Sequence, residues 1–164
     1  MPILAIGNKR LASDAGVTLV EAMVALMIVG LMAGAVVLMA PGPDAKICEE
    51  AERLAARIVL AGEESIILNR SMSLVVTREG YGFERLENAG WIEVEPNSPL
   101  GFRAWPTDID VEVEQSQAGP DDPRVARFDA LGEAAPTKIL ISGPAARWRV
   151  SVNGQGGVDV ARAE

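Results

Sequence analysis

VTLVEAMVALMIVGLMAGAVVLMA, residues 17–40, is the longest apolar stretch in this chain of 164 residues. From Ala22 to Ala40 no side chain carries a charge, an amide or a hydroxyl. A helix of that length measures about 28 Å at about 1.5 Å per residue, close to the hydrocarbon core of a bilayer at about 30 Å. Residues 17–40 are therefore predicted to form a helix that enters a membrane and carries the rest of the chain as a head.

Glu21 is the only charged residue in this stretch. A carboxylate held at the middle of a bilayer costs on the order of 3 kcal/mol, so it must lie at the interface or have a partner. Its position near the start of the apolar run makes it a candidate functional residue.

The segment before the apolar run, residues 1–16, is a short leader that contains Lys9 and Arg10 and ends in Gly16. An ordinary secretory signal has an apolar run of about 7–15 residues followed by a cleavage site between small residues. The sequence at residues 38–41 fits that pattern poorly, and a charge near the start of the run would be unusual. A simple signal-anchored periplasmic protein is the plainest alternative for this end of the chain.

The run Gly-Val-Thr-Leu-Val-Glu at residues 16–21 resembles the prepilin signature of type IV pilins and type II secretion pseudopilins. The resemblance implies that a prepilin peptidase cuts between Gly16 and Val17 on the cytoplasmic side. It also implies that the new amino terminus at Val17 is N-methylated, and that the helix is kept as a stem for assembly, with Glu21 in an assembly role. Val17 stands where the family usually has phenylalanine.

The formal net charge of the chain is −8 at pH 7. The leader has two basic residues and one acidic residue, so its removal would leave a formal charge of −9. Such a surface repels nucleic acid and anionic lipid. Basic residues precede the apolar run and mostly acidic ones follow it, so the positive-inside rule places the amino terminus in the cytoplasm and the head outside. The resemblance to pseudopilins implies a single-pass protein of the inner membrane whose head lies in the periplasm.

The chain has one cysteine, Cys48, and no histidine. An intrachain disulfide is thus impossible, and Cys48 is predicted to be a small buried residue, with an interchain disulfide as the alternative. Without histidine, a second cysteine or acidic residues at metal-ligand spacing, the usual nucleophile-and-base sites and transition-metal sites cannot be assembled. We expect no enzyme activity, no cofactor, no metal site and no small-molecule substrate.

After the stem, Pro41-Gly42-Pro43 should interrupt the helix, and Asp44 should cap a second helix. Apolar residues then recur every three to four positions as far as Asn69, which predicts an amphipathic helix over residues 41–69. The opposite face, including Glu49, Glu50 and Arg53, is predicted to lie in solvent, with Glu49 and Arg53 as an ion pair.

The head, residues 70–164, changes to alternating apolar and polar residues, which is typical of strands. Ile109, Val111 and Val113 alternate with acidic residues and are predicted to face the core. Residues 96–106 and 115–124 are predicted to be loops. The predicted strands, the first two joined as a hairpin, cover residues 72–77, 81–86, 91–94, 109–114, 138–142, 148–152 and 158–161.

The predicted fold is α+β: a long amino-terminal helix, half transmembrane and half amphipathic, packed on a mainly antiparallel sheet of about six to eight strands. This order resembles the H-type minor pseudopilin (GspH) family of type II secretion. Residues 61–71, 74–76, 80–86 and Trp91 resemble the stretch where that family leaves its helix and forms its first hairpin. Residues 128–133 resemble its Phe-x-x-x-Gly turn before the late strands, with Leu131 where the family often has proline.

Two classes of function remain open. The resemblance implies a structural subunit at or near the tip of a secretion pseudopilus, with other minor and major pseudopilins and the prepilin peptidase as partners. The alternative is a minor pilin of a type IV pilus or DNA-uptake system whose head binds DNA. DNA binding needs several basic residues, and the local candidates are Arg147, Arg149 and Arg162, with Trp148 pointing into the core. The acidic charge of the chain favours the secretion subunit.

Overall fold

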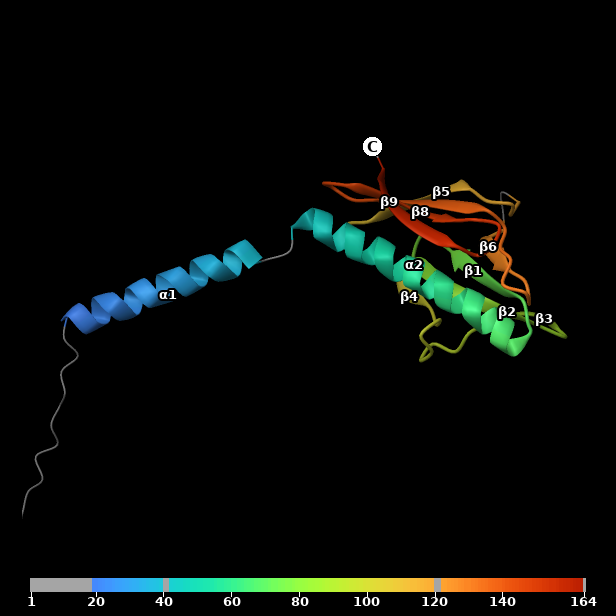
Figure 1. The fold of residues 1–164 in the computed structure, drawn as a ribbon, viewed down its shortest axis with the longest axis horizontal. Coiled ribbons are helices and arrows are strands. Elements are labelled where there is room, and N and C mark those ends of the chain that lie inside the picture. The colour runs from blue at the N-terminus through green and yellow to red at the C-terminus, as the bar shows by residue number, and fades with distance from the viewer. Residues whose placement is uncertain (1–18, 40–41, 120–121, 164) are drawn as a thin grey trace, which may run out of the picture. The chain divides into compact units, whose positions relative to one another are not determined.

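The structure, a computed structural model, describes residues 19–39, 42–119 and 122–163 (Figure 1). Contacts within the chain divide it into two units, residues 1–40 and residues 41–164. We describe each unit by itself.

The first unit contains helix α1, Leu19–Met39. This agrees with the helix predicted over residues 17–40, although Val17, Thr18 and Ala40 lie outside the described residues. Among the residues described, none of the helices combines the length and hydropathy that a membrane span requires. The membrane span over residues 17–40 stays a prediction.

The second unit begins with helix α2, Pro43–Leu68. Its N-cap is Gly42, which has no side chain to make a capping hydrogen bond, and Pro43 occupies the first turn. The prediction that Asp44 caps this helix is therefore wrong. Proline at the start of a helix has its φ preset and lacks an N–H that would otherwise be unpaired, so the helix begins two residues earlier than predicted and Asp44 lies in the first turn.

The other end of α2 agrees with the predicted boundary at Asn69. Asn69 has a φ of 50°, the left-handed conformation that ends many helices, and its N–H donates to the carbonyl of Ile66 at 3.1 Å. The chain leaves the helix there and enters the first strand three residues later.

The strands of the head form two antiparallel sheets. Five of them form sheet A, in the order β3-β2-β1-β6, with β4 paired to the other end of β2. These are β1 Met72–Val76, β2 Gly80–Glu87, β3 Gly90–Glu93, β4 Arg103–Ala104 and β6 Arg124–Phe128. Sheet B has the order β5-β7-β8-β9, formed by β5 Asp110–Gln115, β7 Thr137–Ser142, β8 Arg147–Val152 and β9 Val158–Ala163.

The predicted α+β fold, a helix on antiparallel strands, is confirmed, but the expected single sheet is two sheets. The described residues form nine strands, and the sequence prediction missed β4 and β6. Strand β6 starts at Arg124, where a loop was expected, and pairs with β1. Strand β6 is short, and its partner β1 lies about 50 residues earlier, so no local sequence pattern predicts that the two strands pair.

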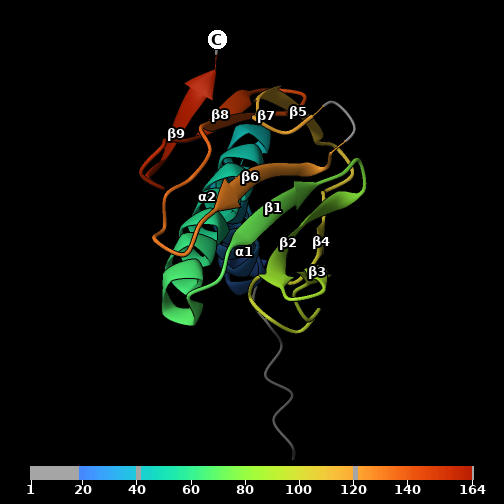
Figure 2. The ribbon, with the colours of Figure 1, turned by 90° about the vertical axis from the view of Figure 1, so that its right-hand side faces the viewer.

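Helix α2 packs against both sheets. The amino-terminal half lies under sheet B and the carboxyl-terminal half under sheet A, as Figures 1 and 2 show. Its buried face contains mainly small and aliphatic side chains: Ile47, Ala51, Leu54, Ala55, Ile58 and Ala61. The predicted inward positions Ile109, Val111 and Val113 of sheet B also pack against this core.

Cys48 is half-buried beside this face, not fully buried as predicted. Its Sγ lies 3.6 Å from Oε1 of Glu52. Burial, together with the nearby Glu52 carboxylate, raises the pKa of the Cys48 thiol. The alternative, an interchain disulfide at Cys48, stays a prediction.

Glu50, predicted to lie in solvent, is only 2% exposed. One of its carboxylate oxygens accepts hydrogen bonds from the Tyr81 hydroxyl at 3.3 Å and from Nε of Arg103 at 3.2 Å. The other accepts from Nη1 of Arg53 at 2.6 Å. A buried carboxylate is tolerated when its oxygens are paired in this way. Glu50 thereby links α2 to β2 and β4.

We predict that Glu50→Ala lowers the free energy of unfolding by about 2 kcal/mol, because it removes three hydrogen bonds to a charged group and leaves a buried gap. The expected loss is moderate because the side chains of Arg53 and Arg103 are partly exposed, so water can replace their hydrogen bonds to Glu50. Glu49→Ala is the matched control: Glu49 pairs with the same Arg53 at 2.5 Å but is exposed, so its loss should cost less than about 0.5 kcal/mol.

Urea unfolding of the full chain in detergent, followed by tryptophan fluorescence, measures both variants, since all three tryptophans lie in the head. If Glu50→Ala and Glu49→Ala lowered the free energy of unfolding equally, the buried Glu50 carboxylate would not stabilise the head more than an exposed one does.

Candidate assembly surfaces

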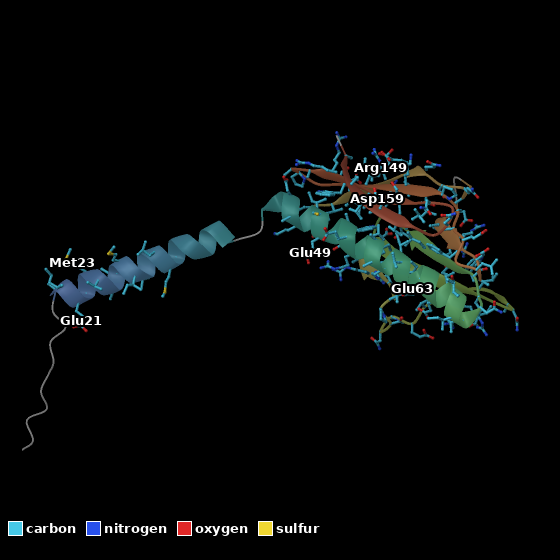
Figure 3. All side chains as sticks on the ribbon, in the orientation of Figure 1. Glu21, Met23, Glu49, Glu63, Arg149 and Asp159 are labelled. Carbon is cyan, nitrogen blue, oxygen red and sulfur yellow. The ribbon has the colours of Figure 1, made fainter. Side chains whose placement is uncertain are left out.

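Glu21 lies in the first turn of α1 and is the only charge on that helix. The side chains described from Leu19 to Gly34 are all exposed, among them Glu21 and Met23, labelled in Figure 3. An acidic group in the first turn is favoured by the positive end of the helix dipole. The helix thus presents an apolar surface with a single carboxylate near its start.

Gly16 and Val17, the predicted cleavage and methylation residues, lie outside the described residues. Of the three predicted site residues the structure therefore places only Glu21.

The outer face of α2 is a mixture of acidic and apolar residues. Glu49 and Glu63 point away from the sheets in Figure 3. Between and beyond them, Val59 and Ile67 are exposed, Ile67 at 79%. The predicted solvated face is thus confirmed for Glu49, while the carboxyl-terminal half of the face is more apolar than predicted.

The Glu50 cluster is the part of the head that sequence reasoning missed. Glu50 lies three residues after Ile47 and four before Leu54, both buried, so its helical position did signal burial. The hydrogen bond to Glu50 raises the pKa of Arg103, and burial raises the pKa of Tyr81. These groups keep their ordinary charges at neutral pH, and the cluster is a fixed structural link.

Arg57, about two turns after Glu50 along α2, holds the segment between β3 and β4. Its Nε donates to the Pro99 carbonyl at 2.8 Å, and its Nη2 donates to the Gly101 carbonyl. The guanidinium also lies 4.8 Å from the ring centroid of Tyr81. Arg57 therefore fixes this segment against the helix.

The arginines considered for DNA binding lie on sheet B, and acidic groups neutralise two of them. Arg149 makes a two-point ion pair with Glu114, at 2.6 Å and 3.0 Å, which raises the pKa of Arg149 and lowers that of Glu114. Arg162 lies 3.7 Å from Asp44. Trp148 packs against the core, as predicted. Two of the three candidate arginines therefore already have an acidic partner.

Within residues 19–39, 42–119 and 122–163, no three or more Cys, Asp and Glu side chains gather closely enough to hold a metal ion.

Two family models match the chain. The model described as type II transport protein GspH matches residues 50–156, and the model described as prokaryotic N-terminal methylation motif matches residues 11–37. No curated protein sequence matches significantly.

The head also resembles solved structures. The minor pseudopilin EpsH from the type 2 secretion system of Vibrio cholerae is 18% identical, with a TM-score of 0.58 over 69% of this chain and 94% of that chain. A second structure of the same protein is 17% identical, with a TM-score of 0.59 over 70% and 93%. The solution structure of GspH from E. coli is 12% identical, with a TM-score of 0.57 over 69% and 85%.

At such identities these likenesses establish the shared fold alone. The family model, in contrast, spans about two thirds of the chain, from α2 to the loop before β9. The chain belongs to the family of type II transport protein GspH.

Proposed function

We propose that this chain is a structural subunit at or near the tip of a type II secretion pseudopilus and supports protein export across the outer membrane. The observation that carries the proposal is the presence, in one chain, of an N-terminal methylation motif over residues 11–37 and a GspH head over residues 50–156. The role is structural, not catalytic.

In this proposal residues 17–40 anchor the subunit in the inner membrane, with the head in the periplasm. The peptidase removes residues 1–16, and other pseudopilins pack against the stem. The apolar surface of α1 supports this role, because the side chains described from Leu19 to Gly34 are exposed and nearly all apolar. Such a surface is stable in lipid or against other apolar helices.

Glu21 would act during assembly. Before assembly it lies four residues after Val17, about 6 Å along a helix, and can reach the cytoplasmic interface. In a filament, stems pack away from water, where a lone carboxylate is costly. The amino terminus of a neighbouring subunit, protonated because its ordinary pKa is about 7.7–8.0, would offset that cost. The pairing would also fix the axial register of the stems.

We predict that Glu21→Ala leaves membrane insertion and cleavage intact but reduces incorporation into the pseudopilus by at least about tenfold. Breaking a buried ion pair costs about 3–5 kcal/mol, and 1.4 kcal/mol corresponds to a factor of ten. The expected effect is set below the full cost because a subunit near the tip has fewer neighbours. Co-purification with partner subunits and the amount of secreted protein measure it.

Met23→Ala is the matched control, since it truncates an exposed residue of the same helix without removing charge. Glu21→Asp should restore part of the assembly. Normal co-purification together with undiminished secretion for Glu21→Ala would reduce Glu21 to an interfacial residue and refute its proposed role.

We predict that Gly16→Leu leaves the leader attached, because the peptidase must approach the backbone closely at the scissile bond. Mass spectrometry of the membrane-extracted wild-type protein should find a chain that begins at methylated Val17. A mature chain that begins at Pro41 would instead identify an ordinary signal peptide and reject the pseudopilin stem.

We predict no measurable binding of the full chain to duplex DNA at near-physiological salt, because Arg149 and Arg162 already face carboxylates and the net charge is acidic. Fluorescence anisotropy with labelled duplex tests this. Tight binding that weakens steeply with salt, and that Arg147→Ala with Arg149→Ala abolishes, would favour the DNA-uptake alternative.

A further inference from the structure

Sheet A has a small apolar hollow on the face that does not contact α2. We call it the outer groove; its wall and floor include Val75, Gly80, Gly82, Pro96 and Phe102. Val75 and Gly82 are cross-strand partners, and side chains of alternate residues share one face. The opposite face contains buried Leu74 and Tyr81 and faces the core. The groove has a volume of about 150 Å³.

Two glycines of β2 shape this groove. A Cβ on Gly82 would lie 3.2 Å from Cα of Phe102, and one on Gly80 would lie 2.6 Å from the end of the Phe102 ring. The absence of these side chains lets the segment that enters β4 cross close to β2. Phe102 itself stays 57% exposed and forms an open apolar wall.

Residues of α2 hold the Phe102 wall of the outer groove in place. Arg57 binds the carbonyls of Pro99 and Gly101, and the next residue after Phe102, Arg103, binds the buried Glu50. The groove is therefore preformed, and a ligand does not have to order this segment.

One end of the groove is acidic. Glu84 and Glu93 line it and lie directly opposite each other on β2 and β3. Arg124 pairs with Glu84 at 2.6 Å, whereas Glu93 is exposed and forms no ion pair with the described residues. An apolar hollow that ends at an unpaired carboxylate complements an apolar side chain followed by a cation.

We propose that the outer groove receives one aromatic or large aliphatic side chain, flanked by Lys or Arg, from the head of an adjacent pseudopilin. A cavity of about 150 Å³ accommodates a benzene ring, so the size fits one such side chain. A site for a single side chain binds weakly by itself and becomes effective when an assembly holds the partner at high local concentration. For this reason the ligand is assigned to a neighbouring subunit, which rests on the proposed function.

The first test uses the full chain, ¹⁵N-labelled in detergent, and the probe acetyl-Gly-Phe-Lys-Gly-amide. NMR shifts should concentrate on the amides of Gly80, Gly82 and Phe102, with millimolar affinity. A peptide with Glu in place of Lys should bind at least about fivefold more weakly, because its charge is repelled by Glu93. A peptide with Ala in place of Phe should also bind at least about fivefold more weakly, because it leaves the apolar hollow unfilled.

Glu93→Lys should reverse the preference between the Lys and Glu peptides, and Val75→Trp should fill the groove and abolish binding. Glu112→Lys is the matched control, an exposed acidic residue on β5 of the other sheet, and should bind as wild type does. Equal affinity for the Lys, Glu and Ala peptides, or shifts spread over other surfaces, would overturn the site.

The second test places a photo-cross-linking phenylalanine analogue at residue 102 of the full chain in secreting cells, with adducts identified by mass spectrometry. The expected adduct is another subunit that carries a methylated apolar stem. No adduct, or adducts with exported proteins only, would overturn the assignment of the partner. Peptide binding by the purified chain does not depend on secretion, so this result is separable from a failure of the proposed function.

Discussion

The burial of one face of α2 against two separate sheets is the contact on which the head depends. Sheets A and B have separate strand ladders, linked by a hydrogen bond from the Thr137 hydroxyl of β7 to the Val125 carbonyl of β6 at 2.9 Å, and the helix contacts both sheets. Small residues such as Ala51 and Ala61, both fully buried, allow the sheets to approach the helix closely. Without a disulfide, the chain depends on this shared core for stability.

The same helix also carries the polar links that place the surface features of sheet A. Glu50 and Arg57, one on each side of Leu54, reach β4 and the segment before it. Through these hydrogen bonds α2 fixes the position of Phe102, which forms the wall of the outer groove on the opposite face of sheet A. The buried carboxylate thus has a structural role that an apolar residue at the same position could not fill.

Periodicity predicted the elements in which apolar residues recur at a regular spacing. The alternation at Ile109, Val111 and Val113 predicted β5, and the spacing of apolar residues predicted α2 up to Asn69. Strand β6 was missed because its five residues, Arg124–Phe128, do not alternate between apolar and polar, and Glu50 because a charge was assigned to solvent despite its place in the buried stripe. Of the candidate site, residues 16–21 gave the motif, whereas the outer groove depends on Phe102 meeting Gly82, which no sequence pattern shows.

The contact between α2 and the last strands has a consequence for the order in which the head is completed. Ile47, in the first half of α2, packs so closely on Gly143 that a Cβ at residue 143 would lie 2.3 Å from Cδ1 of Ile47. Strands β8 and β9 cover the same half of the helix. These partners are synthesised about 100 residues after the helix. The carboxyl-terminal half of α2 can pack on β1 soon after both are synthesised, whereas the amino-terminal half lacks β8 and β9 until the carboxyl-terminal hairpin has emerged. That hairpin therefore completes the domain last.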